Sequence, residues 1–600
     1  MTSASHATLT QSIDCLRGRW RDVVELLSGR YSVWLGSGIS RERFPNLGQL
    51  LRSLLDTLHA RIQADDPACP YRRCVESIVQ LTTIRPSNLS EASPANWQDR
   101  DGKRVLSDIV TQLWDKYADV LDQTVRVGDR TLTMTFDLLK LHEIYGDSSP
   151  RPDAEHRYLA LLVAEGVLDE LVTTNWDALI EAAHAECCDG SGQRLDVIAA
   201  SEDIDGTGLA GQPRLTKIHG CARKTLAEPS RYQPYMLATR TDITAWVKLP
   251  ERAPFREMIH QLLRERPALF IGLSGQDWNL QAECFATFMT APPPPATRPR
   301  VTFSTPALQH PQKTFLKALY GANHFAVREE KLVKEAALPL YGKPLLGTLY
   351  VLTLLLKART LADRGFNSPD LSAWCDFVKQ GVSQWQEFLQ QRYDAAVDPH
   401  DAHHVWRQMS DELPRVVTRF VTMYRDLTVL ASPTAYRPLD DRHLGLLATA
   451  DNVVELNHHW LLVVLAALKS GVNQSFWRLD LPRGAAASQG QFTLSLSGRT
   501  LTVFVVRDGA TTLPRMIRHD LIDMTRATDV LVIYPFDREP ARRGASAPVH
   551  TPSRRSLSAP RFPTRTPRRG PLEIWVRDLA DSHPTPTKLI EALRRELQSA

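Results

Sequence analysis

Cysteine is scarce in this sequence, and the few cysteines form no framework. Eight of them are scattered over 600 residues, at Cys15, Cys69, Cys74, Cys187, Cys188, Cys221, Cys284 and Cys375. Small secreted domains instead pack cysteines densely to make disulfides. The first residues also lack the basic start and apolar core of a signal peptide. We therefore expect a cytoplasmic protein with reduced thiols.

Long apolar runs and an excess of one charge are absent as well. The most apolar stretches, residues 345–356 and 460–468, are shorter than the roughly 20 residues that cross a bilayer, so we predict buried helices and no membrane partner. The formal net charge of +4 makes no case by itself for a nucleic-acid or membrane partner. A Gly-Lys-Ser/Thr phosphate loop is missing too, which would place any ATPase on a separate chain.

Histidines and cysteines show no metal-binding spacing. The adjacent histidines at 403–404 and 458–459 fall in helical sequence, where neighbouring side chains point about 100° apart. After His219 the sequence offers Cys221 and then no cysteine before Cys284, so a four-cysteine zinc module cannot form there. We predict no metal site and no zinc.

The first half of the sequence does contain strand-like and helix-like segments in alternation. Such alternation predicts an α/β fold with a parallel, doubly wound, Rossmann-like sheet. A helix is expected directly after the first strand, with Asn46 as its N-cap. The predicted strands lie at residues 31–35, 171–175, 214–220, 268–272 and 301–303, with helices at 47–62, 157–170, 176–187, 254–266 and 314–322.

Three regions follow from this pattern. Residues 1–358 are predicted to form the Rossmann-like domain, residues 359–470 a helical region, and residues 471–600 a smaller α/β domain. Within the last region, residues 540–570 carry eight arginines and no acidic residue. Their Pro, Ser and Arg content predicts a disordered loop. It is either a solvated insertion or a contact, through Arg542 to Arg569, for nucleic acid or a partner.

The first predicted strand ends in a loop that is poor in side chains. It reads Gly36, Ser37, Gly38, Ile39 and Ser40. Glycines let backbone N–H groups approach an anion closely, and the helix that follows contributes partial positive charge. The loop therefore suits the pyrophosphate of a dinucleotide, although such a short motif also occurs by chance.

Polar residues follow three other predicted strands. In a parallel sheet the carboxyl ends of the strands line one crevice, so we expect these residues to converge with the glycine loop. Each could also have an ordinary role, because a strand-end Asn often caps a turn and a lone His is often structural. The residues are Asn175, Asp177, His219, Gly272, Ser274 and Asp277.

In this order the motifs resemble those of the sirtuin family. "GSGIS" resembles the family's Gly-Ala-Gly-Ile-Ser NAD loop, and "TTNWD" its Thr-Gln-Asn-Ile-Asp segment. "IHG" resembles the catalytic His-Gly, and "GLSGQD" is similar to the segment that holds the adenosine ribose. The resemblance spans about residues 30–280, and it implies an NAD+-consuming enzyme with His219 as its catalytic histidine.

Two departures from the family indicate the subtype. Deacylases of this family follow the glycine loop with Ile-Pro-Asp-Phe-Arg, whereas this chain has "RERFPNLGQLL". They also carry two Cys-x-x-Cys pairs of a zinc module, which is missing after His219. Both features resemble the sirtuin-like NAD-consuming domains of bacterial antiphage defence proteins. That resemblance implies a gate by oligomerisation, a HerA-type ATPase, or a short prokaryotic Argonaute with guide nucleic acid.

The chemistry agrees with hydrolysis of NAD+. Nicotinamide leaves the anomeric carbon through an oxocarbenium-like transition state, as in glycoside cleavage. Asn175 could orient the water or the ribose, and His219 could act as general base because histidine ordinarily titrates near neutrality. Asp177 could hold this geometry or start the next helix. Two alternatives remain: an NAD-dependent protein deacylase and a non-catalytic sensor of NAD or ADP-ribose.

Overall fold

The chain folds into two compact units that alternate along the sequence. Unit 1 contains Met1–Val351, Ala396–Ser410 and Asp441–Gly445, and unit 2 contains Leu352–Ala395, Asp411–Asp440 and Leu446–Ala600. The computed structural model describes residues 7–63, 65–84, 100–188, 194–204, 212–275, 278–290, 299–366, 368–396, 401, 403–425, 436, 438–439, 458–481, 492–506, 513, 516–518, 522, 528–535 and 571–599.

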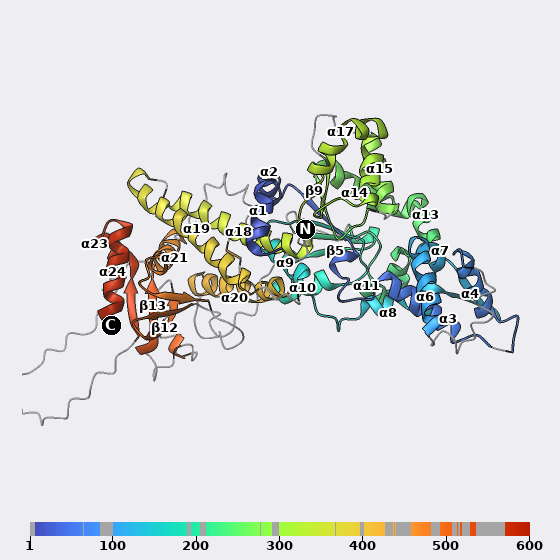
Figure 1. Cartoon of the computed structure of the whole chain (residues 1–600), viewed down its shortest axis with the longest axis horizontal. Coiled ribbons are helices and arrows are strands. Elements are labelled where there is room, and N and C mark those ends of the chain that lie inside the picture. The colour runs from blue at the N-terminus through green and yellow to red at the C-terminus, as the bar shows by residue number, and fades with distance from the viewer. Residues whose placement is uncertain are drawn as a thin grey trace, which may run out of the picture. The chain divides into compact units, whose positions relative to one another are not determined.

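A seven-stranded sheet forms the centre of unit 1 (Figure 1). All of its neighbouring strands are parallel, in the order β5-β6-β4-β1-β7-β8-β9. The strands are β1 (Ser32–Leu35), β4 (Glu170–Thr173), β5 (Asp196–Ile198), β6 (Arg214–Lys217), β7 (Ala268–Ile271), β8 (Val301–Ser304) and β9 (Ala337–Leu338). From β1 the chain adds β4 on one side, passes to the edge strand β5 and returns to place β6 between β5 and β4, and it then adds β7, β8 and β9 in turn on the other side of β1. The predicted doubly wound parallel sheet is confirmed.

Helices connect these strands. Those of unit 1 are α1 (Leu9–Arg17), α2 (Trp20–Leu27), α9 (Ala154–Ala164), α10 (Leu179–Cys188), α11 (Ala222–Ala227), α12 (Pro229–Tyr232), α13 (Arg240–Lys248), α14 (Ala253–Glu265), α15 (Trp278–Thr290), α16 (His310–Tyr320) and α17 (Ala322–Glu335). Short turns of helix lie at Ser37–Ile39, Ser201–Asp203, Gln233–Tyr235 and Pro250–Arg252.

One face of the sheet carries a continuous apolar row. Trp34, Val172, Phe270 and Phe303 share this face because they are partners in register across four strands. They form one core cluster with buried residues of α14, α15, α16 and α17. Burial of such side chains stabilises the fold by about 1.5–3 kcal/mol each. The sheet is thereby held rigid beneath the loops at its carboxyl edge.

A helical insertion follows the glycine loop and has its own core. Its first helix begins after the N-cap Asn46, and leucines of this helix pack against the other helices of the insertion. The predicted N-cap at Asn46 is confirmed, because its side chain accepts a hydrogen bond from the Gln49 N–H. The elements are α3 (Leu47–His59), α4 (Pro70–Gln80), α6 (Arg100–Leu113), Trp114–Lys116, α7 (Tyr117–Leu121), β2 (Thr124–Val127), β3 (Arg130–Thr133), Met134–Leu138 and α8 (Leu141–Gly146).

Helix α18 (Gly342–Gly365) is the most apolar long helix in the described part of the chain. By length and composition alone it could cross a membrane, but 78% of its most apolar window is buried inside the structure. Burial of this kind is typical of a core helix, as predicted for residues 345–356.

Unit 2 contains helices and a mixed five-stranded sheet. Its strands β10, β11 and β12 pair antiparallel, whereas β12, β13 and β14 pair parallel. The strands are β10 (Arg478–Asp480), β11 (Phe492–Leu496), β12 (Arg499–Val505), β13 (Val530–Tyr534) and β14 (Leu572–Trp575). The helices are Pro369–Leu371, α19 (Ser372–Asp394), α21 (His458–Asn473), α23 (Val576–Ser582) and α24 (Pro586–Ser599). The predicted smaller C-terminal α/β fold is confirmed.

Helix α20 (His404–Arg425) starts earlier than the sequence predicted. Within the predicted helical region 359–470, the apolar pattern by itself places a helix at residues 412–431. The helix begins at His404 because Asp401, just before it, accepts hydrogen bonds from the N–H groups of the next turn. The arginines from 542 to 569 lie outside the described residues, so their predicted role stays a prediction.

Candidate functional site

The loops after β1 and β7 pack directly on each other at the carboxyl edge of the sheet. The N–H of Gly36 donates to the Ile271 carbonyl (2.9 Å), and the N–H of Gly38 donates to the Gly272 carbonyl (3.2 Å). A Cβ on Gly38 would lie 2.7 Å from the Gly272 Cα. Only glycine fits at such a distance, so the glycines of the loop have a structural reason besides access for an anion.

Both loops also present small polar residues to solvent. Ser37 and Ser274 are exposed, whereas Ile39 is buried and anchors the first loop. Gly272 has a φ of +69°, a conformation that side chains disfavour. Asp277 lies outside the described residues. This edge therefore combines a rigid backbone with exposed hydroxyl groups.

Asn175 follows β4 and is tied to the glycine loop. Its Nδ2 donates to the Gly36 carbonyl (3.2 Å) and to the Ser40 Oγ (3.2 Å), while its N–H donates to the Thr173 Oγ1 (3.0 Å). The side chain is only 7% exposed. Its Oδ1 is buried and has no hydrogen-bond partner in the described part of the chain. A buried, unpaired acceptor is costly, so this atom is suited to a ligand or a water.

His219 follows β6, the neighbour of β4. Thr173 and Lys217 are partners in register, and Asn175 and His219 each lie two residues beyond them. The two residues therefore follow adjacent parallel strands at equal offset. His219 is half-buried, and its carbonyl accepts from the Leu237 N–H (3.2 Å). The next residue, Gly220, has a φ of +82°, and a Cβ there would lie 2.6 Å from the Tyr235 carbonyl oxygen.

Asp177 has the structural role that the sequence left open. Its Oδ1 accepts from the Leu179 N–H (3.1 Å), which starts α10. Its carbonyl accepts from Lys217, a side chain that is 1% exposed and also pairs with Glu181 (2.9 Å). Burial opposes the charge on Lys217, but the Cys221 thiol and the two carboxylates raise the pKa of this lysine above its ordinary value. Asp177 and Lys217 thus brace the segment behind Asn175.

Two residues that the sequence analysis did not identify complete the polar chain. Ser40 Oγ lies 3.1 Å from the Nε2 of His156, and the His156 Nδ1 accepts from the Asp153 N–H (3.1 Å). His156 is fully buried, which lowers its pKa to about 3. The ring is therefore neutral. The pattern Asp-x-x-His ahead of an apolar helix is a capping signal that could have pointed to this pair.

Aromatic side chains pack beside this polar chain. Tyr145 lies between Phe44, which follows the glycine loop, and Trp176, which follows Asn175, with ring centroids 5.2 Å apart in each pair. The Tyr145 hydroxyl donates to the Pro45 carbonyl (2.9 Å). The group places an apolar wall beside Asn175 and links the insertion to the site.

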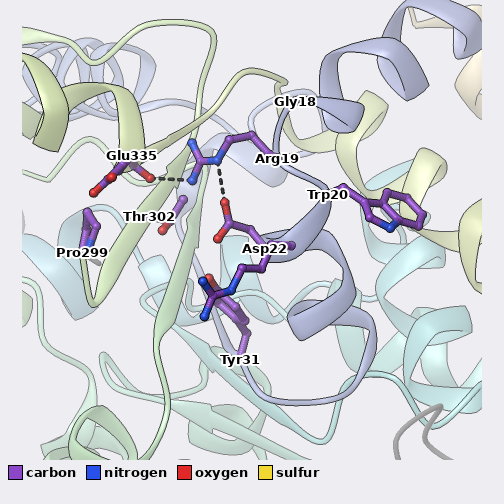
Figure 2. Close-up of a pocket in the computed structure, with 9 residues that line it drawn as sticks. Gly18, Arg19, Trp20, Asp22, Tyr31, Pro299, Thr302 and Glu335 are labelled. Atoms are coloured by element: carbon purple, nitrogen blue, oxygen red, sulfur yellow. Dashed lines mark hydrogen bonds and ion pairs between the residues drawn. The ribbon is translucent and has the colours of Figure 1, made fainter. Parts of the chain in front are cut away.

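A small cavity lies at the opposite edge of the sheet. Figure 2 shows it beside Tyr31 and Thr302, with Arg19 reaching toward Asp22 and Glu335. It measures about 150 Å³. The Arg19 guanidinium donates to the Glu335 carbonyl (2.6 Å) and pairs with Asp22 (2.5 Å). These contacts cap carbonyl groups at the C-terminal end of α17 and give the Arg19 guanidinium its hydrogen-bond partners. The residues around the cavity therefore have a structural explanation.

Possible metal ligands are not gathered anywhere in the described ranges. No group of three or more His, Cys, Asp or Glu side chains there is placed to hold a metal ion. Cys221 and Cys284 are both buried, and neither forms a disulfide.

Part of this region matches a known protein family. Residues 169–319 match a family model described as SIR2-like domain, and such domains use NAD+. A stretch of 73 residues is 41% identical to an NAD-dependent protein deacetylase of Haloarcula marismortui, over 10% of this chain and 28% of that protein. The chain therefore matches under a third of the length of this curated relative. Asn175, His219 and Gly272 lie within the family match, while the glycine loop precedes it.

Proposed function

We propose that unit 1 is an NAD+ glycohydrolase that cleaves the nicotinamide–ribose bond. We propose further that the protein is an effector of a bacterial antiphage defence system and depletes NAD+ on infection. The observation that carries the enzymatic proposal is the register of the sheet, which puts Asn175 and His219 at equal offset beyond adjacent strands. The glycine loop joins them through the hydrogen bond from Asn175 to Gly36.

The residues at this edge fit NAD+ as a substrate. The exposed Ser37 would contact the pyrophosphate beside Gly36 and Gly38, whose own N–H groups hold the loop against the β7 loop, and Ser274 would contact the adenosine ribose. The buried Oδ1 of Asn175 is an unused acceptor that would bind a water or a ribose hydroxyl. Asp277 would support the ribose as well, although it lies outside the described residues.

Hydrolysis then needs a water and a base. The water oxygen forms a bond to the anomeric carbon, the carbon–nitrogen bond breaks, and nicotinamide leaves with the bonding electron pair. His219 takes the proton of the water, and Asn175 orients it. Positioning of this kind and general base catalysis each contribute about 10²-fold or more.

A protein deacylase is the second candidate, and the similarity to an NAD-dependent protein deacetylase favours it. A deacylase would place an acyl-lysine oxygen, not water, at the anomeric carbon. The missing Cys-x-x-Cys pairs and the replaced Asp-Phe-Arg segment count against it. A non-catalytic NAD or ADP-ribose sensor would not need His219.

An NADase in the cytoplasm must be held inactive until it is needed. We propose a gate by the C-terminal region, by self-association, or by a partner such as a HerA-type ATPase or a short prokaryotic Argonaute with guide nucleic acid. The arginines from 542 to 569 would contact nucleic acid or that partner.

Mutation of the two strand-end residues tests the enzymatic proposal. We expect His219→Ala and Asn175→Ala each to lower nicotinamide release from NAD+ by at least about 10²-fold, because the base or the oriented water is lost. Release is followed by chromatography, with and without the genomic neighbours of the protein. Circular dichroism checks that each variant is folded.

A histidine away from the site provides the control. His324 of α17 is also half-buried, and His324→Ala should keep the parental rate. Near-parental turnover by folded His219→Ala would refute the assignment of the base. Release of nicotinamide only when an acylated peptide is added would identify a deacylase instead.

A further inference from the structure

A cluster of charged side chains lies next to the site and has no role in the proposed chemistry. Lys343, in the first turn of α18, is 2.8 Å from both Glu42 and Asp153. Arg407, in the first turn of α20, is 3.0 Å from Asp153 and also pairs with Glu42. Arg43 adds a third cation 3.0 Å from Asp153. Residues more than 360 positions apart in the sequence thus meet at one carboxylate.

Burial makes the loss of any ion pair in this cluster costly in free energy. The side chains of Asp153 and Lys343 are 2% and 3% exposed. Burial alone would raise the pKa of Asp153, but hydrogen bonds from Lys343 and Arg407 hold it well below its ordinary value. Removal of one partner from a buried ion pair leaves an uncompensated charge. Loss of Lys343 or Arg407 would therefore leave part of the Asp153 charge uncompensated.

Asp153 leads directly to the candidate catalytic residues. Its backbone N–H donates to the His156 Nδ1, so the proton of this neutral ring is on Nε2, which faces Ser40. Ser40 in turn accepts from Asn175. Glu42 and Arg43 belong to the same loop, two and three residues after Ser40. The cluster therefore holds the C-terminal end of the glycine loop, both through Ser40 and through Glu42 and Arg43.

The two cations come from helices that leave unit 1. The first residues of α18 and α20 belong to unit 1, but both helices continue into segments of unit 2, beyond Val351 and Ser410. A displacement of the first turn of either helix would move Lys343 or Arg407 relative to Asp153 and would lengthen or break an ion pair.

We propose that Arg407 and Lys343 are positioning residues for NAD+ cleavage, which act through Asp153 and His156 to place Ser40 and Asn175. This inference rests on the proposed NAD+ cleavage. It makes the first turns of α18 and α20 part of the apparatus that sets the rate, and it gives a signal arriving along these helices a physical route to the site.

The test compares two arginines of unit 1 that each pair with an aspartate, the buried Asp153 for Arg407 and the half-buried Asp169 for Arg266. Arg407→Ala should lower kcat for NAD+ by about 10- to 100-fold with a smaller change in KM, because a displacement of about 1 Å at the reacting groups costs up to about 10²-fold. Arg407→Lys keeps the charge and should recover most of the rate. Arg266, which pairs with Asp169 (3.0 Å) just before β4, supplies the control, and Arg266→Ala should keep the parental kcat.

Hydrogen–deuterium exchange gives a readout that needs no turnover. In Arg407→Ala, exchange should rise in peptides covering residues 36–44 and 153–177 and stay unchanged elsewhere. If the parent releases no nicotinamide while this local change occurs, the proposed reaction fails and the positioning role stands. Parental kcat and parental exchange in Arg407→Ala, or an equal loss in Arg266→Ala, would overturn the inference. Should Arg407→Ala not fold, Glu42→Gln removes one charge from the more exposed side of the cluster and tests the same point.

Discussion

His156 has both ring nitrogens assigned by its neighbours. The Asp153 N–H occupies Nδ1, so the remaining proton lies on Nε2 and is donated to Ser40. Ser40 also accepts from Asn175. With both of its accepting positions used, the Ser40 hydroxyl is left with its own proton to donate. The neutral His156 ring therefore fixes which group donates and which accepts in the hydrogen bonds that link Asp153, His156 and Ser40.

The same burial makes His156 a source of acid sensitivity. Its pKa falls from 6.5 to about 3 because burial disfavours the charged ring, and the charges of Asp153, Arg43, Lys343 and Glu181 act on it as well. Between these two values the unfolded state binds a proton that the folded state does not. The free energy of unfolding therefore falls as the pH drops from 6.5 toward 3 and does not change through this group above 6.5.

Denaturation at two pH values measures this effect. Between pH 7 and pH 5 the parent should lose about 2 kcal/mol through His156. We expect His156→Gln to lack this contribution, so that urea midpoints of the variant and the parent converge on acidification. His324→Gln should follow the parental curve. Equal pH dependence in the His156 variant and the parent would show that the ring is not buried as a neutral group.

At the scale of elements, the loops after β1 and β7 can approach each other closely only because glycines lie where they meet. A Cβ on Gly38 would meet the backbone of Gly272 at 2.7 Å. Backbone atoms cannot move aside as a flexible side chain can, so the two loops would have to separate. The Gly38 N–H would then lose its hydrogen bond to the Gly272 carbonyl.

Two glycine-to-alanine substitutions, one at a crowded position and one at an open position, distinguish the effect of crowding between the loops from the effect of adding a methyl group. Gly38→Ala should lower the free energy of unfolding by about 1–3 kcal/mol and weaken NAD+ binding, because it overpacks the junction. Gly18→Ala is the control, since a Cβ there meets only the Cys15 carbonyl oxygen, at 3.9 Å. Calorimetry gives both quantities. If the two variants bind NAD+ equally well, the close packing of the loops does not matter for the ligand.

At the scale of the whole molecule, unit 1 is not a continuous stretch of sequence. Residues 396–410 belong to it although they follow α19 of unit 2. Within them Trp406 is 1% exposed, and its carbonyl accepts from the Tyr158 hydroxyl (2.7 Å). Its ring fills the space beside Gly347, where a Cβ would lie 2.7 Å away. A chain cut at residue 358, the predicted boundary, would lack this part of the core.

Trp406 provides a test of that arrangement in the full chain. Trp406→Ala should destabilise unit 1 by about 3–5 kcal/mol, because it leaves a large cavity and removes a buried aromatic side chain. Thermal unfolding followed by calorimetry measures the shift. Trp20, which is 40% exposed, is the matched control, and its replacement by alanine should have little effect. Equal stability of the two variants would mean that residues 396–410 are dispensable for unit 1.

Much of the fold could be predicted from local pattern. The alternation of strand-like and helix-like segments predicted a parallel sheet, because parallel strands need crossover connections that are usually helices. The cap at Asn46 is equally local, since it involves only the next three residues. The positions of Asn175 and His219 at strand ends followed from the same pattern, whereas their catalytic roles remain predictions, as do the domain boundaries.

By itself, the sequence determined the order of strands and helices, the glycine loop and the residues at the strand ends, because each depends on neighbours a few positions away. Only the tertiary structure decided which groups meet: Asp153 with Lys343 and Arg407, His156 with Ser40, and Trp406 with Tyr158. These partners are separated by up to 254 positions. Nothing in the local pattern specifies such pairs, because they arise only when the folded chain excludes water and each buried charge must find its counterion.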